Sequence, residues 1–76
     1  NSGAIIGKNC IINSKAIIEH DCRINDNCHI ATGAIINGET IVGRNSFIGS
    51  NSTLRNNIKI KKFSFIKFSS KISKNT

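Results

Sequence analysis

The sequence predicts an all-β chain folded as a parallel β-helix of about four triangular coils. Three observations predict this fold: an aliphatic residue recurs at every sixth position, a small residue follows most of these at a fixed distance, and the composition favours strands and tight turns. Sixteen of the 76 residues are Ile and eleven are Asn, whereas Pro, Trp, Tyr and Met do not occur. β-branched Ile favours strands, and Asn tolerates the left-handed backbone conformation that tight turns demand.

The aliphatic repeat runs through the chain without an insertion. Its members are Ile6, Ile12, Ile18, Ile24, Ile30, Ile36, Val42, Ile48, Leu54, Ile60, Ile66 and Ile72. Four residues after each of these stand Cys10, Ala16, Cys22, Cys28, Ala34, Thr40, Ser46, Ser52, Ile58, Ser64, Ser70 and Thr76, and all but Ile58 are small. A period of six fits neither a helix nor simple strand alternation. It predicts a short strand at each aliphatic, then a corner, with large and small side chains alternating inside.

Three hexads close a triangular coil of 18 residues, so residues 18 apart stack and adjacent coils pair as parallel strands. Cys10 and Cys28 then share one inward column, and Cys22 points inward from another face. Buried cysteines of this kind act as small apolar side chains. Parallel side-chain directions and a reducing compartment argue against a Cys10–Cys28 disulfide.

The residue before each aliphatic points outward, and many of these residues are apolar. They are Ile5, Ile11, Ile17, Ile35, Ile41, Phe47 and Phe65. Exposed apolar stripes usually mark an interface. Three-fold packing of such prisms would cover them, so we expect a homotrimer.

The charge is unevenly distributed along this +7 chain. All four acids (Glu19, Asp21, Asp26 and Glu39) precede residue 40, whereas seven of the eleven basic residues lie between positions 55 and 74. The basic tail is interpreted either as a solvated surface or as a site for a phosphate-bearing ligand. We expect no nucleic-acid partner, because only Phe63, Phe65 and Phe68 are available to stack on bases.

No apolar run is long enough to cross a membrane, and no secretory signal is recognisable. We therefore expect a cytoplasmic protein without a membrane partner. The chain opens on NSGAIIG without an initiator Met, and residues 1–76 are interpreted as a single β-helix domain belonging to a longer protein.

Both histidines lie in the segment IIEHDCRINDNCHIATG, residues 17–33. Zinc binding would need His20, Cys22, Cys28 and His29 to converge. The six-residue repeat instead turns the cysteines inward on different faces and leaves the histidines outside, so we predict no metal site. His20 is expected beneath Gly38, with open space above the imidazole. The carboxylate that follows His20 can fix its tautomer, as a general base requires.

The stretch INSKAIIEHDCRINDNCHIATGAIINGETIVG resembles the catalytic segment of hexapeptide-repeat acyltransferases of the sialic acid O-acetyltransferase and sugar N-acetyltransferase (NeuD-like) family. The specific part of the resemblance begins with an Asn. Seven residues later comes a His with an acid on each side, and a Cys follows the second acid. A second His lies nine residues after the first. The resemblance covers residues 1–54 strongly and continues more weakly to the end. It implies a left-handed β-helix that forms a C-terminal catalytic domain, with acetyl-CoA as co-substrate and no metal.

The resemblance also implies residue roles. His20 matches a general base that deprotonates a sugar amine or hydroxyl, and Asp21 matches its acidic partner. His29 matches a second histidine near the acetyl group at a subunit boundary, Asn13 matches an active-site asparagine, and Gly38 matches a glycine that meets the pantetheine arm. Direct transfer is implied, in which the acceptor attacks the thioester while backbone donors stabilise the oxyanion.

Two departures from the family pattern leave alternatives open. The N-terminal Rossmann-like sugar-binding domain of the family has no counterpart here, and Lys61, Lys67 and Phe68 replace glycines of the late repeats. In one alternative Phe68 blocks the path of CoA. In the other, Lys67 and its basic neighbours Lys71 and Lys74 hold the CoA phosphates. Together with Gly38, Lys67 and Ser69 are the expected cofactor contacts. The alternatives to an acetyltransferase are an inactive β-helix remnant or trimerisation module, and a binding module for anionic ligands.

Overall fold

The computed structural model describes residues 2–76, and every regular element in that range is a two-residue strand. The strands are β1 (Ile5–Ile6), β2 (Ile11–Ile12), β3 (Ile17–Ile18), β4 (Arg23–Ile24), β5 (His29–Ile30), β6 (Ile35–Ile36), β7 (Ile41–Val42), β8 (Phe47–Ile48), β9 (Thr53–Leu54), β10 (Lys59–Ile60), β11 (Phe65–Ile66) and β12 (Lys71–Ile72). Each strand ends on one aliphatic of the six-residue repeat, which confirms the predicted period. No helix able to cross a membrane occurs within the described range.

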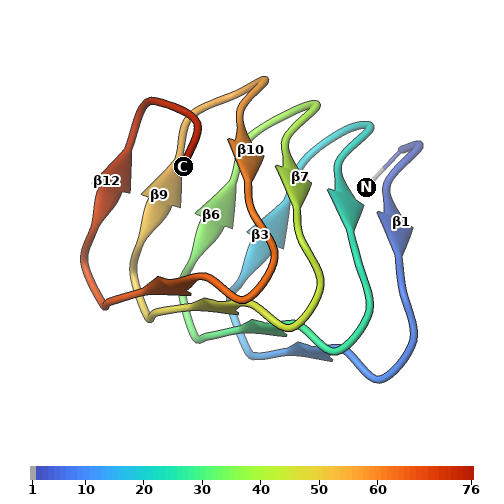
Figure 1. Cartoon of the computed structure of the whole chain (residues 1–76), viewed down its shortest axis with the longest axis horizontal. Helices are drawn as coiled ribbons and strands as arrows, with labels where there is room; N and C mark the ends of the chain where they lie inside the picture. Colours follow the sequence, from blue (N-terminus) through green and yellow to red (C-terminus); the bar gives the residue numbers. More distant parts are fainter. Residues whose placement is uncertain (1) are drawn as a thin grey trace.

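Successive strands lie on successive faces of a triangular prism, and the coils stack side by side along it (Figure 1). The first face contains β1, β4, β7 and β10, the second β2, β5, β8 and β11, and the third β3, β6, β9 and β12. All pairs are parallel and join residues 18 apart, as in Ile5↔Arg23 and Phe47↔Phe65. The chain is therefore a parallel β-solenoid of about four coils, consistent with the predicted left-handed β-helix.

The core is the inward column of aliphatic residues, which is fully buried in the middle coils. Ile24, Ile30, Ile36, Val42, Ile48 and Leu54 are completely inaccessible. Ile6 and Ile12, which open the N-terminal end of the prism, remain about 40% exposed (42% and 39%). The two ends differ, because Ile60 and Ile66 in the edge strands of the last coil are buried (2% and 8% exposed). Each coil of such a repeat protein is buried mainly by its neighbours.

The small inward residues also make a repeated hydrogen bond to the next coil. In each case the side chain at position i donates to the backbone carbonyl at position i+15. The donors and acceptors are Cys10 to Asn25, Cys22 to Asn37, Cys28 to Gly43, Thr40 to Arg55, Ser46 to Lys61 and Ser52 to Lys67. Since Cys, Ser and Thr share this contact, the cysteines are structural members of the column, as predicted.

The corners between faces depend on a left-handed residue in each turn. Positive φ occurs at Gly3, Asn9, Lys15, Asp21, Asn27, Gly33, Glu39, Asn45, Asn51, Asn57, Phe63 and Ser69, again with a period of six. We name the corner between the first and second faces the first corner (8–9, 26–27, 44–45 and 62–63). The second corner joins the second and third faces (14–15, 32–33, 50–51 and 68–69), and the third corner returns to the first face (20–21, 38–39 and 56–57). Asn fills five of these positions, which accounts for five of its eleven occurrences.

The glycines that precede the corners admit the backbone of the next coil. A Cβ on Gly43 would lie 2.7 Å from the carbonyl carbon of Lys61, and one on Gly49 would lie 2.7 Å from that of Lys67. Lys61 and Lys67 are themselves part of the backbone that these glycines accommodate. Their side chains are exposed, so the lysines at these late positions are compatible with the fold.

Candidate functional site

Three ionisable side chains from two adjacent coils meet at the third corner. His20 and Asp21 follow β3, and Glu39 follows β6 one coil later. Each offers a ligand atom, and the three atoms lie within 4.8 Å of one another. Within residues 2–76 no other group of three His, Cys, Asp or Glu side chains lies so close together. The six-residue period produces this cluster, because residue 39 stacks on residue 21 across one 18-residue coil.

The corner backbone fixes where these side chains start. Asp21 and Glu39 both have left-handed conformations, with φ of 57° and 62°. The Glu39 N–H donates to the His20 carbonyl at 2.9 Å, and the Asp21 N–H donates to the Ser2 carbonyl at 3.1 Å. These bonds hold both carboxylate-bearing residues on the edge of the prism, where their side chains are exposed to solvent.

The contact between His20 and Asp21 selects one tautomer of the imidazole. His20 Nδ1 lies 3.3 Å from Asp21 Oδ2. With Nδ1–H donating to the carboxylate, Nε2 carries the lone pair. Both side chains are about 60% exposed (60% and 61%), so a solute can reach this pair. The arrangement can accept a proton at Nε2.

The predicted open space above the His20 imidazole is wrong. A Cβ placed on Gly38 would lie 2.7 Å from His20 Cε1 and would also strike Nε2 and Cδ2. The ring therefore fills the space over Gly38 instead of lying beneath a void. A side chain at position 38 would displace the imidazole from this place.

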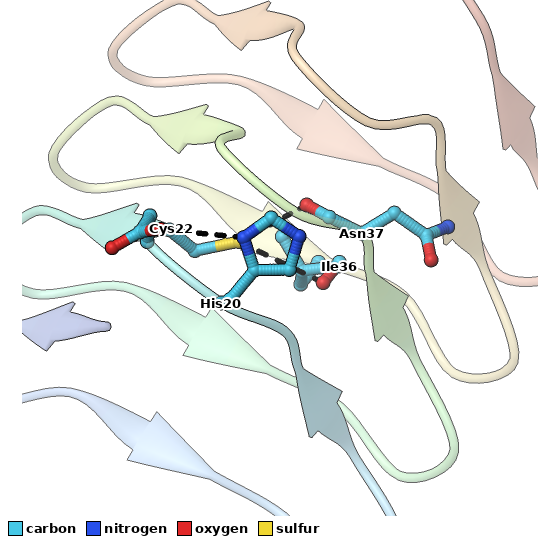
Figure 2. Close-up of polar contacts among 5 residues, drawn as sticks. His20, Cys22, Ile36 and Asn37 are labelled. Carbon is cyan, nitrogen blue, oxygen red and sulfur yellow. Dashed lines mark hydrogen bonds and ion pairs between the residues drawn. The ribbon is translucent and has the colours of Figure 1, made fainter. Parts of the chain in front are cut away.

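Cys22 lies buried beneath this corner, and its sulfur contacts backbone carbonyls. Its sulfur donates to the carbonyl oxygens of Asn37, at 3.0 Å, and Ile36, at 3.7 Å (Figure 2). Burial raises the pKa of the Cys22 thiol, and it raises that of Cys28 in the same way. Because the thiolate is the form that attacks or binds metal, neither cysteine is suited to be a nucleophile or a ligand.

The second histidine lies in a different environment on the second face. His29 Nε2 lies 3.1 Å from Asn13 Oδ1 in the preceding coil, so the two predicted partners of the site are in contact. The His29 ring meets the edge of Phe47 with centroids 5.1 Å apart, and Phe47 stacks on Phe65 at the same separation. Ile11 continues this outward column below His29, and Phe65, at its other end, is 72% exposed.

The structure therefore divides the predicted residues into separate groups within one chain. His20, Asp21 and Gly38 lie together at the third corner. Asn13 and His29 lie on the second face, which is the face that does not meet that corner. Lys67 and Ser69 lie at or beside the second corner in the last full coil and are exposed.

Sequence reasoning missed Glu39, although the signal was available. Counting 18 residues from Asp21 reaches Glu39 directly. An imidazole with two carboxylates is also a donor set that could take a divalent cation. The sequence predicted no metal site, because His20, Cys22, Cys28 and His29 were not expected to converge. That prediction did not consider the cluster at this corner, to which the buried sulfurs of Cys22 and Cys28 do not belong.

Comparisons with known proteins support the repeat assignment. The family model for the bacterial transferase hexapeptide (six repeats) matches residues 3–38, just under half of the chain. The match contains Asn13, His20, Asp21 and His29, and it ends at Gly38. Neither the curated proteins nor the solved structures gave a match. Residues 3–38 are thus similar to a repeat of transferases, and the structure shows that the same architecture continues to residue 72.

Proposed function

We propose that the chain is the catalytic β-helix of an acetyl-CoA-dependent acetyltransferase, which moves an acetyl group to an amine or hydroxyl of a sugar. The observation that carries the proposal is the His20–Asp21 pair at an exposed corner, with Nδ1 directed to the carboxylate. The match of residues 3–38 to the bacterial transferase hexapeptide supports a transferase. The similarity to the sialic acid and amino-sugar acetyltransferases supports the choice of acetyl-CoA and of a sugar.

In this proposal His20 is the catalytic base. Nε2 takes the proton from the acceptor N–H or O–H while the acceptor atom forms a bond to the thioester carbonyl carbon. The carbon–sulfur bond then breaks, and the leaving thiolate of CoA takes the proton back from the imidazolium. Asp21 holds the tautomer and stabilises the transient positive charge. Glu39 adds a second carboxylate beside the ring.

The separation of His20 from His29 supports a homotrimer as the active form. In a packed trimer the second face of one chain would lie against the third corner of its neighbour. Ile11, Phe47 and Phe65 would be covered, and His29 with Asn13 would approach the acetyl group. Gly38, Lys67 and Ser69 would then face the cofactor from different chains, which removes the difficulty that they lie apart in one chain.

Transfer assays on the purified protein test this proposal. Thiol release from acetyl-CoA would be followed with sialic acid and with amino sugars as acceptors. His20→Ala should lower the rate of transfer by about 10²–10⁴-fold, which is the usual contribution of a general base. Its affinity for acetyl-CoA, measured by calorimetry, should change little. Asn56→Ala is the matched control, because Asn56 occupies the same exposed column two coils later and carries no base.

Three outcomes would contradict the proposal. Absence of acetyl-CoA binding at millimolar concentration would favour a structural module instead. Equal transfer by His20→Ala and the unchanged protein would show that the base is elsewhere. Activity that disappears with a chelator and returns with a divalent cation would instead assign His20, Asp21 and Glu39 to metal binding.

A further inference from the structure

A basic groove lies on the first face, away from both histidines. It has a volume of about 600 Å³ and extends from β7 and β10 to the first corner. Four cationic residues line it: Arg44, Lys59, Lys61 and Lys62. Asp26 is its one acidic residue, and one oxygen of that carboxylate already accepts the Lys8 N–H at 2.8 Å. The charged side chains that line the groove, four cations and one carboxylate, therefore sum to a formal charge of +3.

An aromatic residue in an unfavourable backbone conformation contacts Arg44, one of the cations that line this groove. Phe63 follows Lys62 and has φ of 60°, in a column whose other members are Asn9, Asn27 and Asn45. A bulky side chain in the left-handed region is a genuine outlier, and such outliers concentrate at functional sites. The ring is 62% exposed, so burial in the core does not explain its presence.

The Phe63 ring contacts one of the cations of the groove. The Arg44 guanidinium lies over it, 5.1 Å from the ring centroid, and the Phe63 N–H donates to the Arg44 carbonyl at 2.9 Å. Gly43 allows this close approach, since the backbone of Lys61 and Lys62 lies directly over it. Two adjacent coils thus carry the Phe63 ring, the Arg44 guanidinium above it and the ammonium groups of Lys59, Lys61 and Lys62.

We propose that this groove binds a nucleoside diphosphate. Its cations suit a ligand of roughly −3 charge, since a terminal phosphate carries up to about −2 at neutral pH. Arg pairs with phosphate in a bidentate manner, and Lys supplies point charges. The exposed ring offers a surface on which a base stacks. The volume is in the range of small-molecule sites, roughly 300–1,000 Å³. This site is independent of the transferase proposal and uses none of its residues.

Calorimetry with ADP and UDP tests the groove directly. Lys61→Gln/Lys62→Gln should weaken binding by at least about tenfold, because it removes two charge-assisted contacts. Lys8→Gln/Lys15→Gln is the matched control, since it removes the same charge from residues that do not line the groove and should change affinity less than about twofold. Phe63→Asn should weaken the binding of ADP while leaving that of pyrophosphate unchanged, because only the nucleotide carries a base.

The His20→Ala variant separates this site from the transferase site. It should bind ADP as the unchanged protein does, even where it no longer transfers acetyl groups. Equal losses of affinity for ADP in the two lysine double variants would overturn the proposal. The binding would then depend on the net charge of the protein and not on the groove. Tighter binding of a single-stranded oligonucleotide than of ADP, abolished by the same groove substitutions, would also overturn it in favour of a nucleic-acid surface. The proposal would also be overturned if neither ADP nor UDP bound at millimolar concentration.

Discussion

The third and the first corners of the prism have the same backbone and opposite chemistry. At the third corner, Asp21 and Glu39 surround His20 with negative charge. At the first corner, Arg44 and Lys62 accompany Phe63 and lie beside a basic groove. Both corners use a left-handed residue in every turn, and both are closed by the same pattern of backbone hydrogen bonds.

The comparison shows how a repeat fold separates structure from function. The inward columns are restricted to aliphatic and small residues, because each coil is buried by its neighbours. The outward corner positions are restricted only in φ, which Asn, Gly and Asp satisfy most easily. Departures from those three residues are therefore informative, and Glu39 and Phe63 are the departures at these two corners.

The largest expected effects come from two Gly→Ala substitutions, one at the third corner and one directly before the first corner. Gly38→Ala would strike the His20 ring, which can rotate away, so the fold should persist while transfer falls by about a hundredfold. Gly43→Ala would strike the backbone of Lys61 and Lys62, which cannot move freely. It should cost about 1–3 kcal/mol in the free energy of unfolding.

Thermal unfolding and acetyl-transfer assays on both alanine variants would measure the contrast. If Gly38→Ala destabilised the protein as much as Gly43→Ala, the imidazole at the third corner would be fixed rather than adjustable. The role of Gly38 would then be structural.

The next effect concerns the charge at the third corner alone. Asp21→Asn keeps a side chain suited to the left-handed turn, so thermal stability should be nearly unchanged. It removes the carboxylate from His20 Nδ1, and kcat should fall roughly two- to fivefold, as expected for an exposed pair. Glu39→Gln should have a smaller effect. A larger loss from Glu39→Gln would exchange the roles of the two acids.

Much of this architecture was predictable from the sequence because the period is physical. An aliphatic at every sixth residue can be buried only if the chain turns at every sixth residue, so the strands and the inward cysteines followed. The same count placed Gly38 in contact with His20. It did not show that the ring fills the space over Gly38, because a side-chain rotamer is set by local contacts and not by the period.

The candidate site was predictable only in part, for a different reason. The histidines were recognised by residue type and spacing, and the contact between His29 and Asn13 is a finding of the structure. His20 and His29 belong to parts of the prism that do not meet. Their proposed cooperation depends on the packing of a second chain, and no periodicity within one chain can specify that packing.

A smaller effect is expected from restoring the common turn residue at the first corner. Phe63→Asn gives that position the residue found at 9, 27 and 45 in the coils below. It should stabilise the protein by about 1 kcal/mol, because the left-handed conformation costs a bulky residue about that much. Chemical denaturation would measure the gain. A destabilised variant would mean that the contact with Arg44 outweighs the backbone strain.

The smallest effect compares the two buried thiols, one inside each corner. Burial raises the pKa of Cys22, below the third corner, and of Cys28, below the first. Above about pH 8.5 the unfolded chain loses these protons before the folded chain does, so the free energy of unfolding falls as pH rises. Below that pH the contribution of the thiols to the free energy of unfolding is constant.

Cys22→Ser and Cys28→Ser should each reduce the loss of stability at alkaline pH, measured by denaturation between pH 7 and 10. The double variant should reduce it further. At pH 7 each should change stability by less than about 1 kcal/mol, since Thr40, Ser46 and Ser52 make the same hydrogen bond. An unchanged alkaline slope in the double variant would assign that slope to groups other than the thiols.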